Sequence, residues 1–560
     1  MTCQNCKQNF AILPEDTAFY EKMQVPPPTF CPVCRFQRRT MFRNERVLYR
    51  RQCDLCKKEI ISIHAADKPY PVYCNPCWWS DSWDQTATAR PYDPSRSFFE
   101  QYRELVRSQP QVALVVDLST LENSDYSNHV GHVKNCYLLF DANYCGNTHY
   151  STSLNACKDS MDMHLVWESE LCYAVINGTR VYRTFYSEDC TDCHEVYFSK
   201  NLTGCSNCFG CINLKNKSYH IFNEPYSKED YDKKISEFAL HSWEGLSEIR
   251  ERVRTFWLTH PHKAMRERMT ENVSGDYIYE SKNAHECFQV RGVEDSKFCT
   301  RLNVKTTKDS YDYFEWGFNA QRVYECITVG EEVDSIKFSF FVLHSFDIEY
   351  AMMIFFGQNL FGCAGLRNKK FCILNKQYSQ KAFVELRDRI IADMTQRPYK
   401  DQLGRMWKYG EFPPYDLSLF GYNESTAMQY DPLAKEVALA RGYPWYDTNP
   451  GAYKITLETE KIPDSIMDVT DSITKEMIGC VTCGKPYRII KHELELLRKF
   501  GLPIPRACPD CRAGARMARL APSFFHDRTC AKCGRAIQTS YAPERPELVY
   551  CQTCYEGEVI

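Results

Sequence analysis

The residues best suited to chemistry in this chain are cysteines that occur as eight Cys-x-x-Cys pairs. Four pairs lie near each end, at Cys3/Cys6, Cys31/Cys34, Cys53/Cys56, Cys74/Cys77, Cys480/Cys483, Cys508/Cys511, Cys530/Cys533 and Cys551/Cys554. Every N-terminal cysteine has a counterpart at one constant offset, as Cys3 has in Cys480, so the three gaps between pairs are identical in the two copies. Two such pairs supply the four thiolates that tetrahedral zinc prefers. The spacing therefore predicts a duplicated module and four structural zinc sites, two in each copy.

The pairing of these cysteines has two solutions that the spacing alone does not separate. The first pair can join the second and the third the fourth, or the pairs can interleave, first with third and second with fourth. Redox-active pairs of the thioredoxin kind need only one pair beside a βαβ unit, so eight pairs favour metal. The chain has 30 cysteines and opens Met1-Thr2-Cys3 without a secretory signal, so we expect a cytoplasmic protein with reduced thiols. Its longest apolar runs, such as Ala351–Gly357, are too short for a membrane span.

Arginines fill the insert between the two sites of each module. They are Arg35, Arg38, Arg39, Arg43, Arg46, Arg50 and Arg51 in the first copy and Arg512, Arg516, Arg519 and Arg528 in the second. Residues 1–83 carry 12 Lys/Arg against 8 Asp/Glu and residues 479–560 carry 13 against 8, so the ends are basic although the whole chain has a net charge of −3. Arginines spaced by three or four positions form a helical face suited to phosphate. This pattern predicts contact with nucleic acid or a ribonucleoprotein, and a helix that faces solvent or protein acids is the alternative.

Short elements must hold the cysteine pairs in place. Residues 14–22 and their counterpart 491–500 are predicted to form amphipathic helices, the second of which stops at Gly501. The run Pro505-Arg-Ala-Cys508-Pro-Asp-Cys511-Arg512, with Cys480-Val-Thr-Cys483 and the helix before it, resembles the probable zinc-ribbon domain family. Residues 530–554 are similar to a second short zinc-binding motif that ends in Val-Tyr-Cys-x-x-Cys. These resemblances cover both modules and imply zinc binding.

The middle of the chain is a second duplication. Phe209–Asn223 returns as Phe361–Asn375, and each copy follows a long stretch of short, aromatic-rich strand-like pieces. The pieces recur at a period of roughly 12 to 15 positions, and stacked repeats of this kind favour a β-solenoid. We therefore expect a mainly β protein with short helices (α+β), in which two double-zinc modules flank a duplicated solenoid-like middle. The expected parts are 1–83 (double zinc module), 84–118 (helix and strand bridge), 119–262 (repeat unit 1), 263–396 (repeat unit 2), 397–478 (connector) and 479–560 (double zinc module).

Over its full length the chain resembles a group of uncharacterised bacterial multi-CxxC proteins with the same plan, paired zinc modules around a Cys/Tyr/Asn-rich repeat region. The run Gly204-Cys-Ser-Asn-Cys-Phe-Gly-Cys211 carries this resemblance. It implies no catalytic residues.

Other cysteines of the repeat region permit further metal chemistry. Cys190, Cys193, Cys205, Cys208 and Cys211 have spacings that an iron–sulfur cluster or a fifth zinc could use, and Cys190-Thr-Asp-Cys193-His194 spells a haem-attachment sequence. Only Cys211 has a counterpart in the second repeat, Cys363, so the fold does not demand a metal there. Scattered cysteines such as Cys136, Cys157 and Cys172 are instead expected to fill the interior.

Catalytic patterns are sparse. Carboxylate pairs in a solenoid groove would suit a carbohydrate-active enzyme, and Asp159 with Asp162 and Asp309 with Asp312 are candidates. Phosphate loops, nucleophile elbows and dinucleotide fingerprints are absent from the sequence. We therefore expect a non-enzymatic zinc-binding protein whose basic ends dock nucleic acid or a ribonucleoprotein, with a protein–protein scaffold as the alternative and a solenoid enzyme third.

Overall fold

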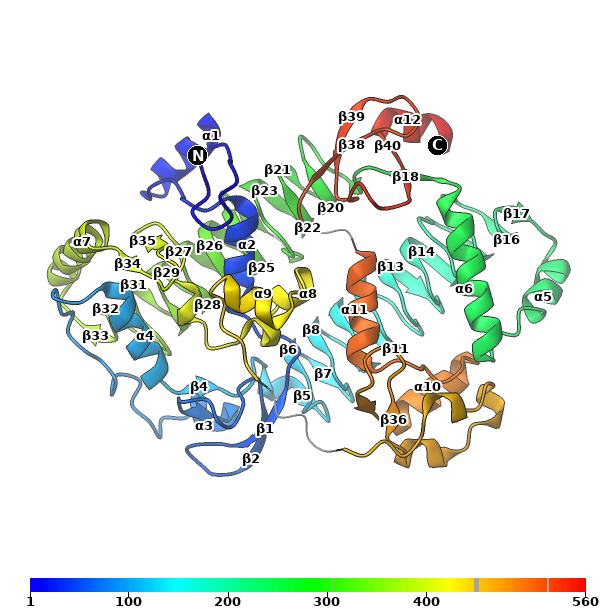
Figure 1. Ribbon diagram of the computed structural model, residues 1–560, viewed down its shortest axis with the longest axis horizontal. Coiled ribbons are helices and arrows are strands. Elements are labelled where there is room, and N and C mark those ends of the chain that lie inside the picture. Colours follow the sequence, from blue (N-terminus) through cyan, green and yellow to red (C-terminus); the bar gives the residue numbers. More distant parts are fainter. Residues whose placement is uncertain (305, 448–452, 521–522, 560) are drawn as a thin grey trace.

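A computed structural model describes residues 1–304, 306–447, 453–520 and 523–559 of the chain. Two β-solenoid units lie side by side, and the terminal modules pack against them with both chain ends on the same side of the molecule (Figure 1). Twelve short α-helices accompany the strands within the described residues. The predicted fold class is confirmed.

The first unit is a stack of short parallel strands in which each residue pairs with its equivalents one turn before and one turn after. Thr152 on β10 pairs with Phe140 on β8 and with His164 on β12. The unit contains β5 (Leu121–Glu122), β6 (Asn128–Gly131), β7 (Val133–Lys134), β8 (Phe140–Asn143), β9 (Gly146–His149), β10 (Thr152–Asn155), β11 (Lys158–Met161), β12 (His164–Trp167), β13 (Ile176–Tyr182), β14 (Glu188–Tyr197), β15 (Ser206–Phe209), β16 (Ser218–Ile221) and β17 (Glu224–Pro225).

A ladder of side-chain amides on the outside of this unit shows the length of one turn. Asn123 donates to Asn135 and Asn135 donates to Asn147, each across a sequence separation of 12. The period of the solenoid is therefore 12, at the lower end of the range expected from the sequence.

The second unit repeats this design with a less regular start. Phe340 pairs with Met352 at the regular period, but Lys297 pairs with Tyr311, so that turn is longer than the others. Its strands are β19 (Glu267–Arg268), β20 (Gly275–Tyr279), β21 (Lys282–His285), β22 (Cys287–Arg291), β23 (Val293–Lys297), β24 (Thr307–Lys308), β25 (Tyr311–Trp316), β26 (Ala320–Gly330), β27 (Val333–Lys337), β28 (Phe340–Leu343), β29 (Phe346–Glu349), β30 (Met352–Phe355), β31 (Gln358–Phe361), β32 (Lys370–Ile373) and β33 (Lys376–Gln377).

A residue with positive φ at every third position gives each turn its corners. Asp141, Tyr144 and Asn147 are three in succession, with φ of 52°, 57° and 48°. Residues other than glycine rarely adopt this conformation, so the stacked backbone hydrogen bonds must hold it in place. The residue after each corner points inward, as Ala142 and Cys145 do. A corner at every third position within a period of 12 makes a turn of four short sides.

Small polar side chains fill the interior and satisfy the backbone at these corners. The Ser151 hydroxyl donates to the His149 carbonyl at 2.8 Å and accepts from the Met163 amide at 3.0 Å. An inward-facing cysteine on another side of the turn, Cys172, donates its thiol to the Glu170 carbonyl at 3.3 Å. Cys136 and Cys157 make the same kind of contact and are buried, so the predicted role of these cysteines as interior fillers is confirmed.

The terminal modules are built from equivalent elements. The first contains α1 (Pro14–Lys22), α2 (Pro32–Thr40), β1 (Tyr49–Gln52), β2 (Glu59–Ser62), β3 (Val72–Tyr73) and α3 (Asn75–Trp79). The second contains β36 (Ile478–Gly479), β37 (Pro486–Tyr487), α10 (Lys491–Phe500), α11 (Pro509–Arg519), β38 (His526–Thr529), β39 (Ala536–Thr539), β40 (Leu548–Tyr550) and α12 (Gln552–Val559). Helices α1 and α10 have the predicted bounds, and Gly501 ends α10 in the left-handed conformation.

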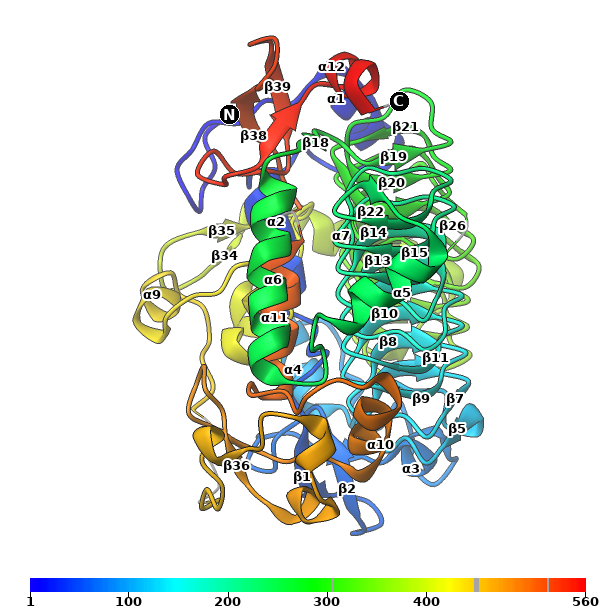
Figure 2. The same cartoon turned by 90° about the vertical axis from the view of Figure 1, so that its right-hand side faces the viewer.

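Helices cover the solenoids on one side. Seen from the right-hand side of Figure 1, α2, α6 (Trp243–Leu258) and α11 form a layer over one face of the stacked turns (Figure 2). Each unit is followed by helix, α5 (Lys228–Ser236) with α6 after the first and α7 (Gln380–Gln396) after the second. Helix α4 (Phe98–Ser108) lies in the bridge before unit 1 and is followed by β4 (Gln111–Val112).

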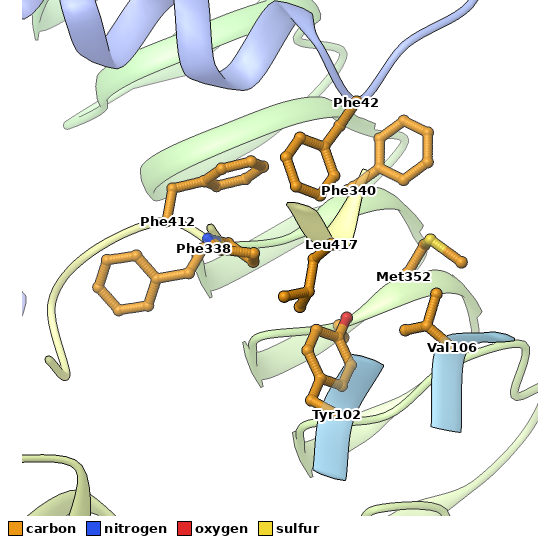
Figure 3. A pocket seen from close by; sticks show the side chains of 10 residues that line it. Phe42, Tyr102, Val106, Phe338, Phe340, Met352, Phe412 and Leu417 are labelled. Atoms are coloured by element: carbon orange, nitrogen blue, oxygen red, sulfur yellow. The ribbon is translucent and has the colours of Figure 1, made fainter. Parts of the chain in front are cut away.

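The connector is irregular and packs into the core. It holds β34 (Tyr399–Lys400), β35 (Met406–Trp407), α8 (Ala427–Tyr430), α9 (Lys435–Ala440) and several short 3₁₀ turns. Its residues Phe412 and Leu417 meet Phe42, Tyr102 and Phe338 around an apolar cavity of about 10 Å³ (Figure 3). Because a single water needs about that volume, we interpret the cavity as packed core. Among the described residues, no helix combines the length and apolar character that crossing a bilayer requires.

Candidate metal centres and module docking

The sixteen predicted ligands form four separate clusters of four cysteines. The clusters are Cys3, Cys6, Cys31 and Cys34; Cys53, Cys56, Cys74 and Cys77; Cys480, Cys483, Cys508 and Cys511; and Cys530, Cys533, Cys551 and Cys554, and within each the sulfurs lie within 4.8 Å of one another. Consecutive pairs therefore join, and the interleaved pairing is wrong. Sulfur–sulfur distances between the pairs are 3.7–3.8 Å, as for Cys6 with Cys31 and Cys483 with Cys508. Four thiolates about 2.3 Å from a tetrahedral ion would be about 3.8 Å apart.

All four clusters share one backbone construction. The amide that begins the second pair donates to the first sulfur, from Cys31 to Cys3 at 3.3 Å and from Cys508 to Cys480 at 3.2 Å. The residue that follows each first Cys-x-x-Cys pair has positive φ in every case, at Lys7, Lys57, Gly484 and Gly534. This turn folds the backbone around the sulfurs, so each cluster is positioned by contacts within its own module and not by the solenoids.

Backbone donors also prepare the first sulfur of a cluster for metal binding. Burial by itself raises the pKa of the Cys480 thiol, but amide donors from Cys508 and Cys483 bring it down to about 6. The Cys530 thiol has the same surroundings and a pKa of about 6. Because the thiolate is the form that binds a metal, these sites favour metal at neutral pH. With four protein sulfurs and no open position, the arrangement can hold an ion but offers no place for a substrate.

The arginines of the first insert do not form an exposed charged face. Arg35, Arg38 and Arg39 on α2 and Arg43 just after it are buried, which corrects that expectation. Two of the remaining arginines, Arg51 and Arg516, are also buried, and Arg50 is exposed. The others are partly exposed: Arg46, Arg512, Arg519 and Arg528. For the arginines of α2 the structure has the alternative, a helix that faces protein acids; the sequence left this open because helical spacing shows which side chains share a face but not what covers that face.

Acids of unit 2 and of the connector cover the arginine face of α2. The Arg35 guanidinium lies 2.8 Å from Asp312, and Arg39 contacts the other Asp312 oxygen at 3.1 Å. Arg38 lies between Glu325 and Glu411, 2.9 Å from each. All of these side chains are almost inaccessible to solvent. Buried charges need such partners, because an unpaired one would be costly.

The second module docks on unit 1 through the same ion pairs. Arg512 and Arg516, the counterparts of Arg35 and Arg39, both contact Asp162, at 3.1 Å and 2.6 Å. Asp162 and Asp312 occupy equivalent places in the two repeat units, each on the turn that faces its docked helix. We call Asp162 and Asp312 the docking acids. The two halves of the protein therefore reuse one interface.

Each module also reaches the other solenoid unit through its second cysteine cluster. In the first module, Val72 on β3 pairs with Gln111 on β4, which leads into unit 1. In the second, Val549 on β40 pairs with His262 on β18 (Pro261–Lys263), which leads into unit 2. The first cluster of a module thus sits on one unit and its second cluster on the strand that starts the other. Each module bridges the two units.

The carboxylate pairs considered for catalysis lie at these contacts. Asp162 and Asp312 are buried under guanidinium groups, while Asp159 accepts a hydrogen bond from Asn147 and Asp309 pairs with Lys22 at the surface. Their placement is that of structural acids, and it does not support the proposed role in a catalytic groove.

The five cysteines of the alternative metal site lie inside unit 1. Cys190, Cys193, Cys205, Cys208 and Cys211 are buried, and no cluster of three or more metal ligands includes them among the described residues. Their thiols donate to interior carbonyls, as Cys190 does to Glu188 at 3.4 Å. Haem attachment at Cys190 and Cys193 has no support, because neither sulfur reaches the surface.

Comparisons with known proteins do not assign the chain to a family. The chain matches no family model that was compared with it. A comparison with curated proteins gives no match either.

Sequence reasoning missed a large cavity between the two units. Its volume is about 960 Å³, and its lining comes from the first module, the bridge and both units. Residues far apart in the chain meet there, among them Tyr144 and Phe356. Pattern analysis along the chain gives no sign of this, because the site exists only when the units pack together.

Proposed function

We propose that this chain is a non-enzymatic scaffold in which zinc-ribbon-type modules hold four structural zinc ions and clamp two solenoid units into one rigid body. The observation that carries the proposal is that each module bridges both units. The closed Cys₄ sets favour zinc over harder ions, which prefer oxygen ligands, and leave no coordination position for chemistry.

A protein partner fits the charge distribution better than nucleic acid does. The arginines that would have bound phosphate are largely paired with the chain's own acids, for example Arg38 with Glu325 and Glu411. A paired, desolvated guanidinium contributes little to attraction of a polyanion. Docking of nucleic acid or a ribonucleoprotein therefore stands as the second candidate, supported only by the basic balance of the terminal modules.

A native pull-down with nuclease and salt controls separates the two candidates. We expect bound proteins to persist after nuclease treatment and the free protein to elute from heparin at low salt. Steep salt-dependent retention on heparin, with loss of all partners after nuclease, would favour nucleic acid instead.

The clamp is tested separately by removing the metal. Chelation should increase the radius of gyration and expose α2 and α11 to hydrogen exchange. Unchanged scattering and exchange after full metal removal would refute a structural role for the ions.

A further inference from the structure

The cavity between the solenoid units has the size of a ligand site. Its lining includes residues of β6, β8 and β10 of unit 1 and of β25, β28 and β30 of unit 2. Its volume of about 960 Å³ is at the upper end of the range for small-molecule sites. A ligand of several rings would fill it, whereas a single ring would leave most of it empty.

Exposed aromatic side chains line this cavity. Tyr144 is 58% exposed and stacks on His132 with ring centroids 4.5 Å apart, and Phe356 is 54% exposed and stacks on His344 at 4.8 Å. The two stacks come from different units, each built from corners of adjacent turns. Trp79 also lines the cavity and is exposed. Exposed aromatic side chains gathered around one cavity indicate a surface that meets a ligand face.

The floor of the cavity is polar, and its charged groups are paired with one another and with Glu45. Arg301 contacts Asp141 at 2.5 Å, Glu315 at 3.0 Å and Glu45 at 3.1 Å, and Arg43 lies 3.3 Å from Glu45. Burial raises the pKa of Glu315 well above its usual range, against the opposing charge of Arg301, whereas Arg301 and Arg43 hold the pKa of Asp141 low. The guanidinium groups of Arg43 and Arg301 are thus paired with the carboxyl groups of Asp141, Glu315 and Glu45.

Buried groups on this floor lack a hydrogen-bond partner among the described residues. They include Nδ1 of His129 and Nη2 of Arg43, and both residues line the cavity; the Arg43 nitrogen lies 3.7 Å from Glu315 and 4.0 Å from Asp141, beyond hydrogen-bond range. His129 is 9% exposed, and burial together with the charge of Arg43 keeps its pKa well below the usual value, so the ring is neutral. Buried polar atoms are normally paired, so these atoms indicate a partner with hydrogen-bonding groups of its own.

The lining excludes several classes of ligand. A wholly apolar ligand would bury the polar floor without partners, which is costly. An anionic ligand, including a nucleotide, would find the guanidinium groups of Arg43 and Arg301 already neutralised. A ligand with flat C–H faces for the rings and many hydroxyl groups for the floor meets both requirements.

We propose that the cavity between the two solenoid units binds a neutral oligosaccharide. Its sugar rings stack on Tyr144 and Phe356, and its hydroxyl groups reach His129, Asp141 and Arg43. The proposal is independent of how the terminal modules are used.

Titration calorimetry of the zinc-loaded full chain with cello-, malto-, xylo- and chitohexaose tests this proposal, with adenosine, uridine and an RNA hexamer as competitors. We expect at least one hexaose to bind and both Tyr144→Ala and Phe356→Ala to weaken it roughly tenfold each, the loss of one stacking contact. The matched controls are Tyr182→Ala and Phe346→Ala, in the same units, because those rings are 47% and 46% exposed but lie outside the cavity.

The outcomes are distinct. All four replaced side chains are substantially exposed, so each variant should keep the wild-type melting temperature, and one that does not is replaced by the leucine variant at that position. Binding of none of the four hexaoses overturns the proposal, as does equal weakening by cavity and control variants. Tighter binding of the nucleosides or the RNA hexamer would assign the cavity to nucleobases instead.

Discussion

Removal of a docking acid should detach one module and leave the other in place. Asp312 is fully buried and is the shared partner of Arg35 and Arg39. In Asp312→Ala, Glu325 would be the main remaining partner for three guanidinium groups. Breaking a buried ion pair by removing one side costs about 3–5 kcal/mol. We expect a cost of this size for the docking of α2 on unit 2.

Hydrogen exchange read by mass spectrometry measures this cost locally, which matters because a chain of several parts does not unfold in two states. A loss of about 3–5 kcal/mol corresponds to a loss of protection in α2 of roughly 10²–10⁴-fold. Protection in α11 should not change. The reciprocal variant, Asp162→Ala, should expose α11 and spare α2, because Asp162 holds Arg512 and Arg516.

The neighbouring acids provide matched controls. Asp309 and Asp159 lie shortly before the docking acids in the chain and make contacts at the surface, so Asp309→Ala and Asp159→Ala should change protection by less than about twofold. If Asp312→Ala left α2 protected, or if both docking-acid variants exposed both helices equally, the inference of two equivalent, separate docking contacts would fail.

Three further predictions concern the metal, the thiols and a buried histidine. Elemental analysis of the purified chain should give four zinc ions, falling to three in Cys480→Ser and staying at four in Cys190→Ser; a fifth ion lost with Cys190 would restore the alternative site. In the native protein treated with chelator, thiol reagents should modify the sixteen clustered cysteines but not the interior ones such as Cys172, which should react only on unfolding; fast reaction of interior thiols would contradict the solenoid packing. Burial and the nearby His492 lower the pKa of His149 from 6.5 to about 4. Because the unfolded state binds this proton more readily, the free energy of unfolding is unaffected above pH 6.5. It falls by at most about 3 kcal/mol as pH falls towards 4. In urea unfolding, the free energy of unfolding of His149→Phe should fall less than that of the wild type between pH 6.5 and 4. If the two proteins gave parallel curves of unfolding free energy against pH, the assignment would be refuted.

Much of the candidate site was predictable because its determinants are local. The sixteen cluster cysteines, the helices over 14–22 and 491–500 and the stop at Gly501 all follow from spacing within short stretches of the chain. The solenoid was predictable for a related reason, since each turn repeats the same short pattern and pairs with the turns next to it. The choice between the two cysteine pairings needed the structure, because both satisfy a tetrahedral ion equally well.

The sequence by itself determined which residues share a helix face or a turn of the solenoid, because backbone periodicity decides that. Only the tertiary structure decided what those faces meet. The arginine face of α2 is covered by Asp312 and Glu325, which lie in the distant second repeat unit, so a face that resembled a phosphate-binding surface is an internal ion-pair contact. The cavity between the units arises in the same way, from side chains that packing brings together, and no pattern along the chain encodes it.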